Sequence, residues 1–146
     1  MKTADEMKHR FLDFRRRLYA EHDLTAVDAY IHPDFSSHNP LVSGPGRAAY
    51  KAFVQMLHQG VPDLTPVAQH LIVEGSWLMA MTDWVGTHRG TFLGAPASGA
   101  VLSFKTADRY ELRDGMLFEH WDVVDRLDAM VGLGLLHQGP ADSGRD

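Results

Sequence analysis

The sequence contains no cysteine among its 146 residues. This absence excludes thiolate nucleophiles, disulfides and thiolate metal sites, and it is compatible with the cytoplasmic location that we expect. The chain also has no apolar run near the roughly 18 residues that span a bilayer. Met1 is followed by Lys2-Thr-Ala-Asp-Glu6 rather than by an apolar stretch. We therefore expect neither a signal peptide nor a membrane-bound protein.

Basic residues are too few for a polyanion-binding protein. The formal net charge is −5, and the only basic cluster is Arg15-Arg16-Arg17, which lies in a helical pattern. Neither nucleic acid nor an anionic membrane is expected as the main partner. We interpret the cluster as the solvated face of a helix.

Motifs for metal, nucleotide and serine chemistry are also missing. There is no HExxH pair and no Gly-x-Ser-x-Gly elbow, and Gly44-Pro-Gly-Arg-Ala-Ala49 follows no predicted strand. The nine histidines show no metal-type pairing at helical spacing. We predict no metal and no cofactor, although a site built from His38, His120, Asp108 and Asp122 is an open alternative.

Helical periodicity dominates the first 60 residues. Met7, Phe11, Phe14 and Leu18 recur on one face and predict a helix over about residues 4–21. A short second helix, with Asp23 as its N-cap, ends at Pro33. A turn-rich stretch over 36–46 precedes a third helix, which ends near Gly60.

From about residue 67 the period changes towards two, which indicates strands. Four are predicted, over 67–75, 77–91, 101–113 and 116–125. Asp114-Gly115 between the last two predicts a type I′ hairpin, which needs positive φ at both positions.

This order of elements predicts an α+β fold, with a strongly curved antiparallel sheet wrapped over the N-terminal helices to form a cone. We assign residues 1–136 to one domain and residues 137–146 to a flexible C-terminal tail. Such a cone encloses an apolar cavity between sheet and helices.

Ionisable residues on the last two strands are the main candidates for chemistry. His120 and Asp122 are two residues apart on one predicted strand, so they share a face with their roots roughly 7 Å apart. The facing strand carries Asp108. We interpret this group as an acid/base set, in which desolvation would make a carboxylate a stronger base. The alternative is a salt bridge at the sheet edge, and the sequence leaves open which strand face lines the cavity.

An ordered set of motifs extends this interpretation. They are Tyr30-Ile-His-Pro-Asp34, His38-Asn-Pro40, Pro62-Asp63, Gly86-Thr-His-Arg-Gly-Thr-Phe-Leu-Gly-Ala-Pro96, Asp114-Gly115 and Glu119-His-Trp-Asp122. Over about residues 5–135 the chain resembles the SnoaL-like polyketide cyclases of the nuclear-transport-factor-2-like superfamily.

The resemblance implies a cofactor-independent cyclase, which closes a polyketide ring by an intramolecular aldol reaction. The family's catalytic carboxylate matches Asp122, whereas a histidine of characterised cyclases is replaced by Asp108. The resemblance also implies a homodimer or higher homo-oligomer formed through the sheet. A dehydratase or isomerase of the same fold, or a non-catalytic binder of small ligands, are the alternatives.

A hydrophobic small-molecule substrate requires further contacts within the cone. His38, in the turn-rich stretch, and His88, late in a strand, are candidates, with a turn residue and a structural hydrogen bond as the respective alternatives. The aromatic candidates for stacking against an aromatic substrate are Trp84, Phe53, Phe104 and Tyr110.

Overall fold

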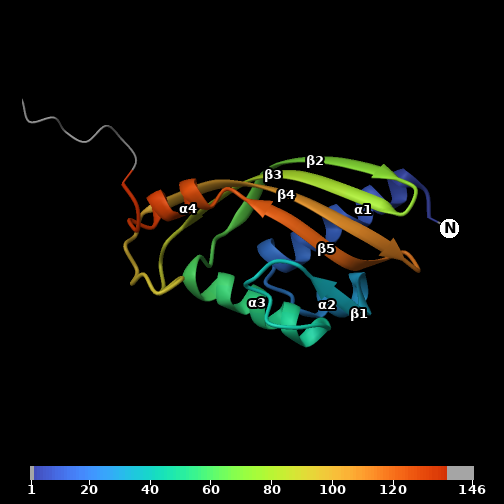
Figure 1. Cartoon of the computed structure of the whole chain (residues 1–146), viewed down its shortest axis with the longest axis horizontal. Helices are drawn as coiled ribbons and strands as arrows, with labels where there is room; N and C mark the ends of the chain where they lie inside the picture. Colours follow the sequence, from blue (N-terminus) through green and yellow to red (C-terminus); the bar gives the residue numbers. More distant parts are fainter. Residues whose placement is uncertain (1, 138–146) are drawn as a thin grey trace, which may run out of the picture.

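A computed structural model describes residues 2–137 of the chain. The helices are α1 (Ala4–Arg15), the π-helical turn η1 (Arg16–Ala20), α2 (Thr25–Tyr30), α3 (Arg47–Gly60) and α4 (Arg126–Gly132). The strands are β1 (Ile31–Ser37), β2 (Thr65–Glu74), β3 (Trp77–Thr87), β4 (Val101–Arg113) and β5 (Met116–Val124). Figure 1 shows the curved sheet lying over the helices, which confirms the predicted α+β fold. The tail predicted over 137–146 lies almost wholly outside the described residues.

The sheet has one more strand than the sequence predicted. Its order is β1-β5-β4-β3-β2, and β1 pairs with β5 in parallel while the other pairs are antiparallel. The second helix, expected to end at Pro33, ends at Tyr30 and gives way to β1, whereas the turn-rich stretch is irregular from His38 to Gly46 as predicted. The sheet that was expected to be antiparallel is mixed, because β1 is parallel to β5. Pro33 lacks an N–H donor, and an edge strand such as β1 tolerates it because only one neighbour needs a ladder of hydrogen bonds.

The hairpin at Asp114-Gly115 is confirmed. The two residues have φ values of 53° and 71°, as a type I′ turn requires. The turn pairs Arg113 with Met116 and Leu112 with Leu117, and a register shift between Glu111 and Leu112 then moves the pairing by one residue. As a result, Asp108 pairs with Asp122 and Tyr110 pairs with His120.

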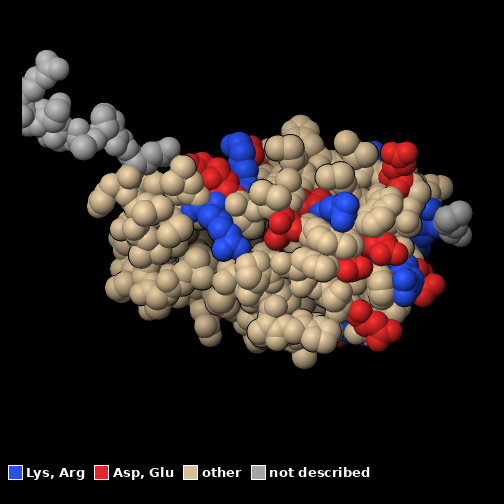
Figure 2. Space-filling view, viewed as in Figure 1, with Lys and Arg blue, Asp and Glu red and all other residues tan. Residues whose placement is uncertain are grey.

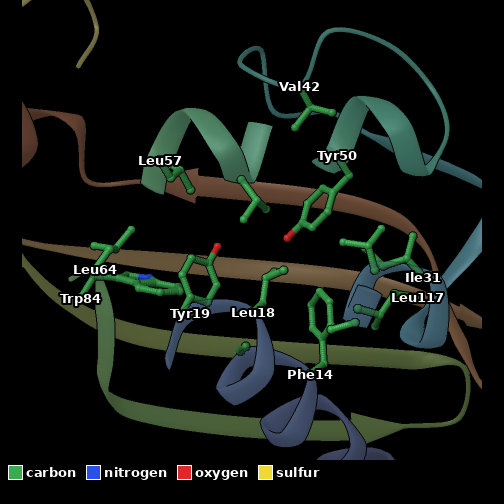
Figure 3. Close-up of a cluster of buried hydrophobic side chains, with 14 of the residues drawn as sticks. Phe14, Leu18, Tyr19, Ile31, Val42, Tyr50, Leu57, Leu64, Trp84 and Leu117 are labelled. Atoms are coloured by element: carbon green, nitrogen blue, oxygen red, sulfur yellow. The ribbon is translucent and has the colours of Figure 1, made fainter. Parts of the chain in front are cut away.

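The N-terminal helices supply one wall of the core. A capping box between Thr3 and Glu6 begins α1, in agreement with the start that periodicity predicted. Phe14, Leu18 and Tyr19 extend from α1 and η1 towards Tyr50 and Leu57 of α3 (Figure 3). This packing holds α1 and α3 against the inner face of the sheet.

The outer face of the sheet carries exposed apolar side chains among charged ones, and within residues 2–137 they remain open to solvent. Ile72 pairs with Met79, Met79 with Arg109, and Arg109 with Trp121, so these side chains form one row across four strands. Apolar side chains on this face remain substantially exposed, namely Ile72, Trp77, Met79, Met81 and Val123.

Charge is unevenly distributed over the surface. On the face drawn in Figure 2, charged side chains extend from α4 across the sheet to the end where the β4–β5 hairpin lies, and the C-terminal half of α3 shows almost none. None of the helices in residues 2–137 has the length and apolar character to cross a bilayer.

Candidate active site

A cavity of about 360 Å³ opens between the helices and the inner face of the sheet. Its walls are mostly apolar, with contributions from Leu57 and Phe53 of α3, Leu102 of β4, and Ala129 and Met130 of α4. The polar side chains in its lining are Arg15, Tyr19, Asn39, Thr106, Asp108, His120, Asp122 and Arg126. An apolar hollow with a few convergent polar groups is typical of a small-molecule site.

Strand alternation places the predicted acid/base set inside this cavity. Asp108, His120 and Asp122 all line it, whereas Val123 is exposed on the opposite face. The inner face of β4 and β5 is therefore the face that lines the cavity, a choice that the sequence left open.

His120 is held on both sides of its ring. Its Nε2 lies 2.7 Å from Asp108 Oδ1 and 4.0 Å from Asp122 Oδ2, while its Nδ1 lies 2.8 Å from Ser37 Oγ. Ser37 Oγ accepts the Asn39 N–H at 3.1 Å, which leaves the hydroxyl proton free for Nδ1. The network is satisfied when Nε2–H donates to Asp108 and Nδ1 accepts the proton of the Ser37 hydroxyl.

Asp108 is engaged through both carboxylate oxygens. Oδ1 accepts from His120, and Oδ2 accepts from Arg15 at 3.1 Å and from the Thr106 hydroxyl at 3.0 Å. Burial raises the pKa of Asp108, but the His120 hydrogen bond and the Arg15 charge outweigh it, so the pKa lies below its ordinary value. Asp108 is therefore an ionised partner that orients His120.

Arg15 is a member of the site that sequence analysis missed. The sequence predicted that Arg15, Arg16 and Arg17 form a solvated helix face. Arg16 and Arg17 do pair with acidic residues at the surface, but the Arg15 side chain is only 4% exposed. Its guanidinium donates to Asp108, Thr82 and Gln69. The sequence feature that could have indicated its burial is its position four residues after Phe11, on the helix face that carries the core residues.

Asp122 is held by a second residue that the sequence did not single out. Asn39 Nδ2 donates to Asp122 Oδ2 at 2.6 Å, and Asn39 Oδ1 accepts the Leu41 N–H at 2.8 Å, which fixes the orientation of the amide. The Asp122 side chain is 9% exposed and remains part of the cavity wall. Asn39 was not predicted because it lies in a turn-rich stretch, where an asparagine is usually a turn residue.

The predicted aromatic contacts fall into two groups. Trp84, Phe53 and Phe104 line the cavity, and Trp84 and Phe104 are nearly parallel at 15°, with centroids 6.5 Å apart. Tyr110 is not part of the lining. It stacks behind His120 at 4.5 Å, where it supports the imidazole rather than a ligand.

The two other predicted contacts, His38 and His88, lie outside the cavity lining. His38 Nε2 lies 2.8 Å from Glu119 Oε1, and its ring stacks on Trp121, because Glu119 and Trp121 point away from the inner face. His88 is fully buried and bonds to Ser98 Oγ and the Ala95 carbonyl. It stabilises the loop over 92–99, which is the structural alternative that the sequence offered.

Asp108, His120 and Asp122 also form the group of potential metal ligands within residues 2–137. Each offers one ligand atom, and these atoms lie within 4.8 Å of one another. However, both oxygens of Asp108 already accept hydrogen bonds from cationic or neutral donors. The arrangement is that of a hydrogen-bonded acid/base network.

Comparison with known proteins extends this description. The sequence model of the SnoaL-like polyketide cyclase family matches residues 9–133. The chain is similar to the aklanonic acid methyl ester cyclase DnrD of Streptomyces peucetius, with 29% identity over 106 residues that cover 72% of each chain. It is equally similar to DauD of Streptomyces sp. strain C5, also an aklanonic acid methyl ester cyclase, with coverage of 72% and 65%. Among solved structures, TsrD of Streptomyces laurentii aligns with a TM-score of 0.84 and 29% identity over 92% of this chain and 100% of that one.

Proposed function

Because this chain belongs to the SnoaL-like polyketide cyclase family, we propose that it closes a ring in a hydrophobic polyketide by an intramolecular aldol reaction, with Asp122 as the base. The observation that carries the proposal is the position of Asp122. Its carboxylate lies on the wall of an apolar cavity of about 360 Å³, with a side chain only 9% exposed.

The proposed reaction begins at an acidic carbon between two carbonyl groups. Asp122 removes a proton from this carbon, and the electron pair of the broken C–H bond forms an enolate. The enolate carbon then attacks a ketone of the same substrate, so that a C–C bond forms as the C=O π bond breaks. Asp122 returns its proton to the resulting alkoxide, which regenerates the carboxylate and leaves the atoms of the substrate unchanged in number.

The other polar residues of the cavity hold the Asp122 carboxylate in place, and the aromatic residues contact the substrate. Asn39 holds Asp122 by its 2.6 Å hydrogen bond, and the pair of His120 and Asp108 lies beside it. Trp84, Phe53 and Phe104 supply apolar surface against which the rings of a polyketide pack.

A methyl ester of an aromatic polyketide acid is the proposed substrate class. The relatives DnrD and DauD are named for aklanonic acid methyl ester. An ester carries no charge, which suits a mostly apolar cavity whose buried cation, Arg15, is already paired with Asp108. Aklanonic acid methyl ester is therefore the first compound to assay.

The test is the substitution Asp122→Asn, which preserves size and removes the basic oxygen. We expect ring closure to fall by about 10²–10⁴-fold, the usual contribution of a general base, with an unchanged melting temperature. Asp83→Asn is the matched control, since Asp83 is a half-exposed carboxylate on β3 that pairs with Lys105 at the surface. Wild-type turnover by Asp122→Asn would refute the assignment of the base.

Product analysis separates the alternatives within the same fold. An aldol cyclase gives a product of the same mass as its substrate, whereas a dehydratase gives one lighter by a water. A non-catalytic binder would retain ligand affinity in Asp122→Asn and show no turnover in the wild type.

We also propose that a second copy of this chain covers the outer face of the sheet. The exposed row of Ile72 and Met79, with Met81 beside it, is apolar surface that a homodimer would bury. Met79→Glu should produce a monomer on a sizing column with ring closure retained. A wild-type protein that is monomeric at micromolar concentration would exclude this assembly.

A further inference from the structure

Two carboxylates face each other in this cavity, and they differ in their hydrogen bonds and ion pairs. Asp108 and Asp122 are paired across β4 and β5, and both line the cavity. Asp108 accepts hydrogen bonds on both oxygens and forms an ion pair with Arg15. Within residues 2–137, no lysine or arginine lies in ion-pair contact with Asp122.

Arg15 is fixed in place on every side. Its Nη1 donates to Gln69 and Thr82, and its Nη2 donates to Asp108. The guanidinium also lies over the Phe11 ring at 4.5 Å and over the Trp84 ring at 5.0 Å. A planar group held by three acceptors and two rings has little freedom to move towards another carboxylate.

The local helix geometry explains this placement. Arg15 is the last residue of α1, and the π-helical turn η1 begins at Arg16. Arg15 and Tyr19 both reach the cavity, while Arg16 and Arg17 remain at the surface. Single π-turns of this kind occur frequently at functional sites.

We infer that Arg15 is a positioning residue that selects between the two carboxylates, because it holds Asp108 as the acceptor of His120 and so leaves Asp122 as the proton-accepting carboxylate of the cavity. The inference rests on the proposed function of Asp122 as base, and it assigns the selection to a residue on a different element of the fold.

The other groups around Asp108 cannot replace Arg15. His120 and Asp122 face it from β5, Tyr110 from β4, Tyr19 from η1 and Tyr50 from α3. The three tyrosines are neutral at neutral pH, because burial raises their pKa values further above the usual 10. Without Arg15, only His120 and Thr106 would oppose the burial that raises the pKa of Asp108, so the pKa would rise and Asp108 would compete with Asp122 for the same proton.

The first experiment follows the side-chain carboxyl carbons of aspartate by NMR during a pH titration of the intact protein. In the wild type, Asp108 should titrate below its ordinary value. In Arg15→Met its midpoint should rise by at least about one pH unit, a tenfold change in proton affinity, and Arg15→Lys should restore part of the shift. An unchanged Asp108 midpoint in either folded variant would overturn the inference.

A double-mutant comparison addresses the reaction and guards against misfolding. Arg15→Met leaves a buried, unpaired carboxylate, whereas Arg15→Met with Asp108→Asn removes both charges and should fold. If Arg15 acts through the charge of Asp108, the double variant should match the kcat of Asp108→Asn within about twofold, although Arg15→Met alone lowers kcat at least about tenfold with little change in KM. If the kcat losses of Arg15→Met and Asp108→Asn multiply in the double variant, Arg15 has a merely structural role and the inference is refuted.

The two readouts separate this inference from the proposed function. Absence of ring closure in the wild type would refute the function, while the NMR titration would still report whether Arg15 fixes the ionisation of Asp108. An unshifted titration in an active enzyme would refute the role of Arg15 alone.

Discussion

Asn39 donates a 2.6 Å hydrogen bond from its amide nitrogen to Asp122, and its own orientation is fixed because its carbonyl oxygen accepts the Leu41 N–H. The loop after β1 and the strand β5 are therefore joined at the carboxylate that we propose as the base. Since β1 pairs in parallel with β5, the end of β1 reaches the level of His120, and the loop continues to Asp122.

This relationship predicts the effect of Asn39→Ala. A hydrogen bond to a charged group contributes about 1.5–3 kcal/mol, which corresponds to a roughly 10–100-fold fall in kcat if the orientation of Asp122 depends on it. KM should change little, because the Asn39 amide is directed at Asp122 rather than at a ligand. Steady-state kinetics of ring closure with aklanonic acid methyl ester provide the measurement.

His38→Ala is the control for Asn39→Ala. His38 belongs to the same loop, but its ring stacks on Trp121 outside the cavity lining. Its kinetics should match the wild type. A larger kinetic loss in His38→Ala than in Asn39→Ala would contradict the assignment of residues to the two faces.

The sequence predicted most of the fold because local signals agreed with tertiary structure. The sequence predicted the Asp114-Gly115 turn, the four alternating strands and the helices α1, α2 and α3. β1 was missed because a parallel edge strand of seven residues that contains Pro33 has no alternating pattern of its own. Its pairing depends on β5, which is more than 80 residues later in the sequence.

The predicted acid/base set was brought together, but its partners were not predictable. Strand spacing alone places His120 and Asp122 on one face. Asp108 joins them through the register shift between Glu111 and Leu112, because the turn alone would set Asp108 opposite Trp121. Arg15 reaches Asp108 across 93 residues, and Asn39 reaches Asp122 across 83. Periodicity within a single element contains no information on such contacts, and a basic run or an Asn-Pro turn has a commoner explanation in each case.

Tyr19 provides a prediction for alkaline pH. Burial raises the pKa of Tyr19 to about 12, so the folded state favours the neutral phenol more than the unfolded state does. The resulting stability is fully present below pH 10 and is lost as the pH rises through 12. At pH 11 the loss is about 1.4 kcal/mol, the equivalent of one pKa unit.

Urea unfolding at pH 8 and pH 11 would measure this effect. Tyr50 and Tyr110 are also buried, with pKa values raised in the same direction, so the wild type should lose more than Tyr19 alone accounts for. Tyr19→Phe should lose about 1.4 kcal/mol less than the wild type between the two pH values. An identical loss in both proteins would show that Tyr19 ionises freely in the folded state.

His58 gives the corresponding prediction for acidic pH. Its ring stacks on His22 at 3.9 Å, and its buried Nε2 has no hydrogen-bond partner within the described residues. Burial, with a smaller contribution from the His22 charge, lowers the pKa of His58 to about 4. The neutral imidazole is therefore favoured on folding, and the stability that it contributes is lost as the pH falls from 6.5 through 4.

His58→Phe should reduce this sensitivity to acid. Melting temperatures at pH 7.5 and pH 5 should differ less in His58→Phe than in the wild type, because phenylalanine keeps the ring stack without an ionisable nitrogen. His9→Phe, which removes an exposed imidazole near the N-terminus, should behave as the wild type does. If all three proteins lose the same number of degrees, the acid sensitivity arises elsewhere.

Ala129 on α4 tests whether the cavity is the substrate site. Its methyl group lines the cavity beside Met130, so Ala129→Phe would place a ring in space that is empty in this structure. Because the ring enters a cavity rather than a close-packed core, the melting temperature should change little. KM should rise by at least about tenfold, since the loss of even one methylene-sized contact in an apolar pocket is worth about 1–3 kcal/mol.

Leu127→Phe is the matched control, because Leu127 is half-exposed on the same helix and absent from the cavity lining. Equal KM values for the two variants would place the substrate outside this cavity and would remove the basis for Asp122 as the base.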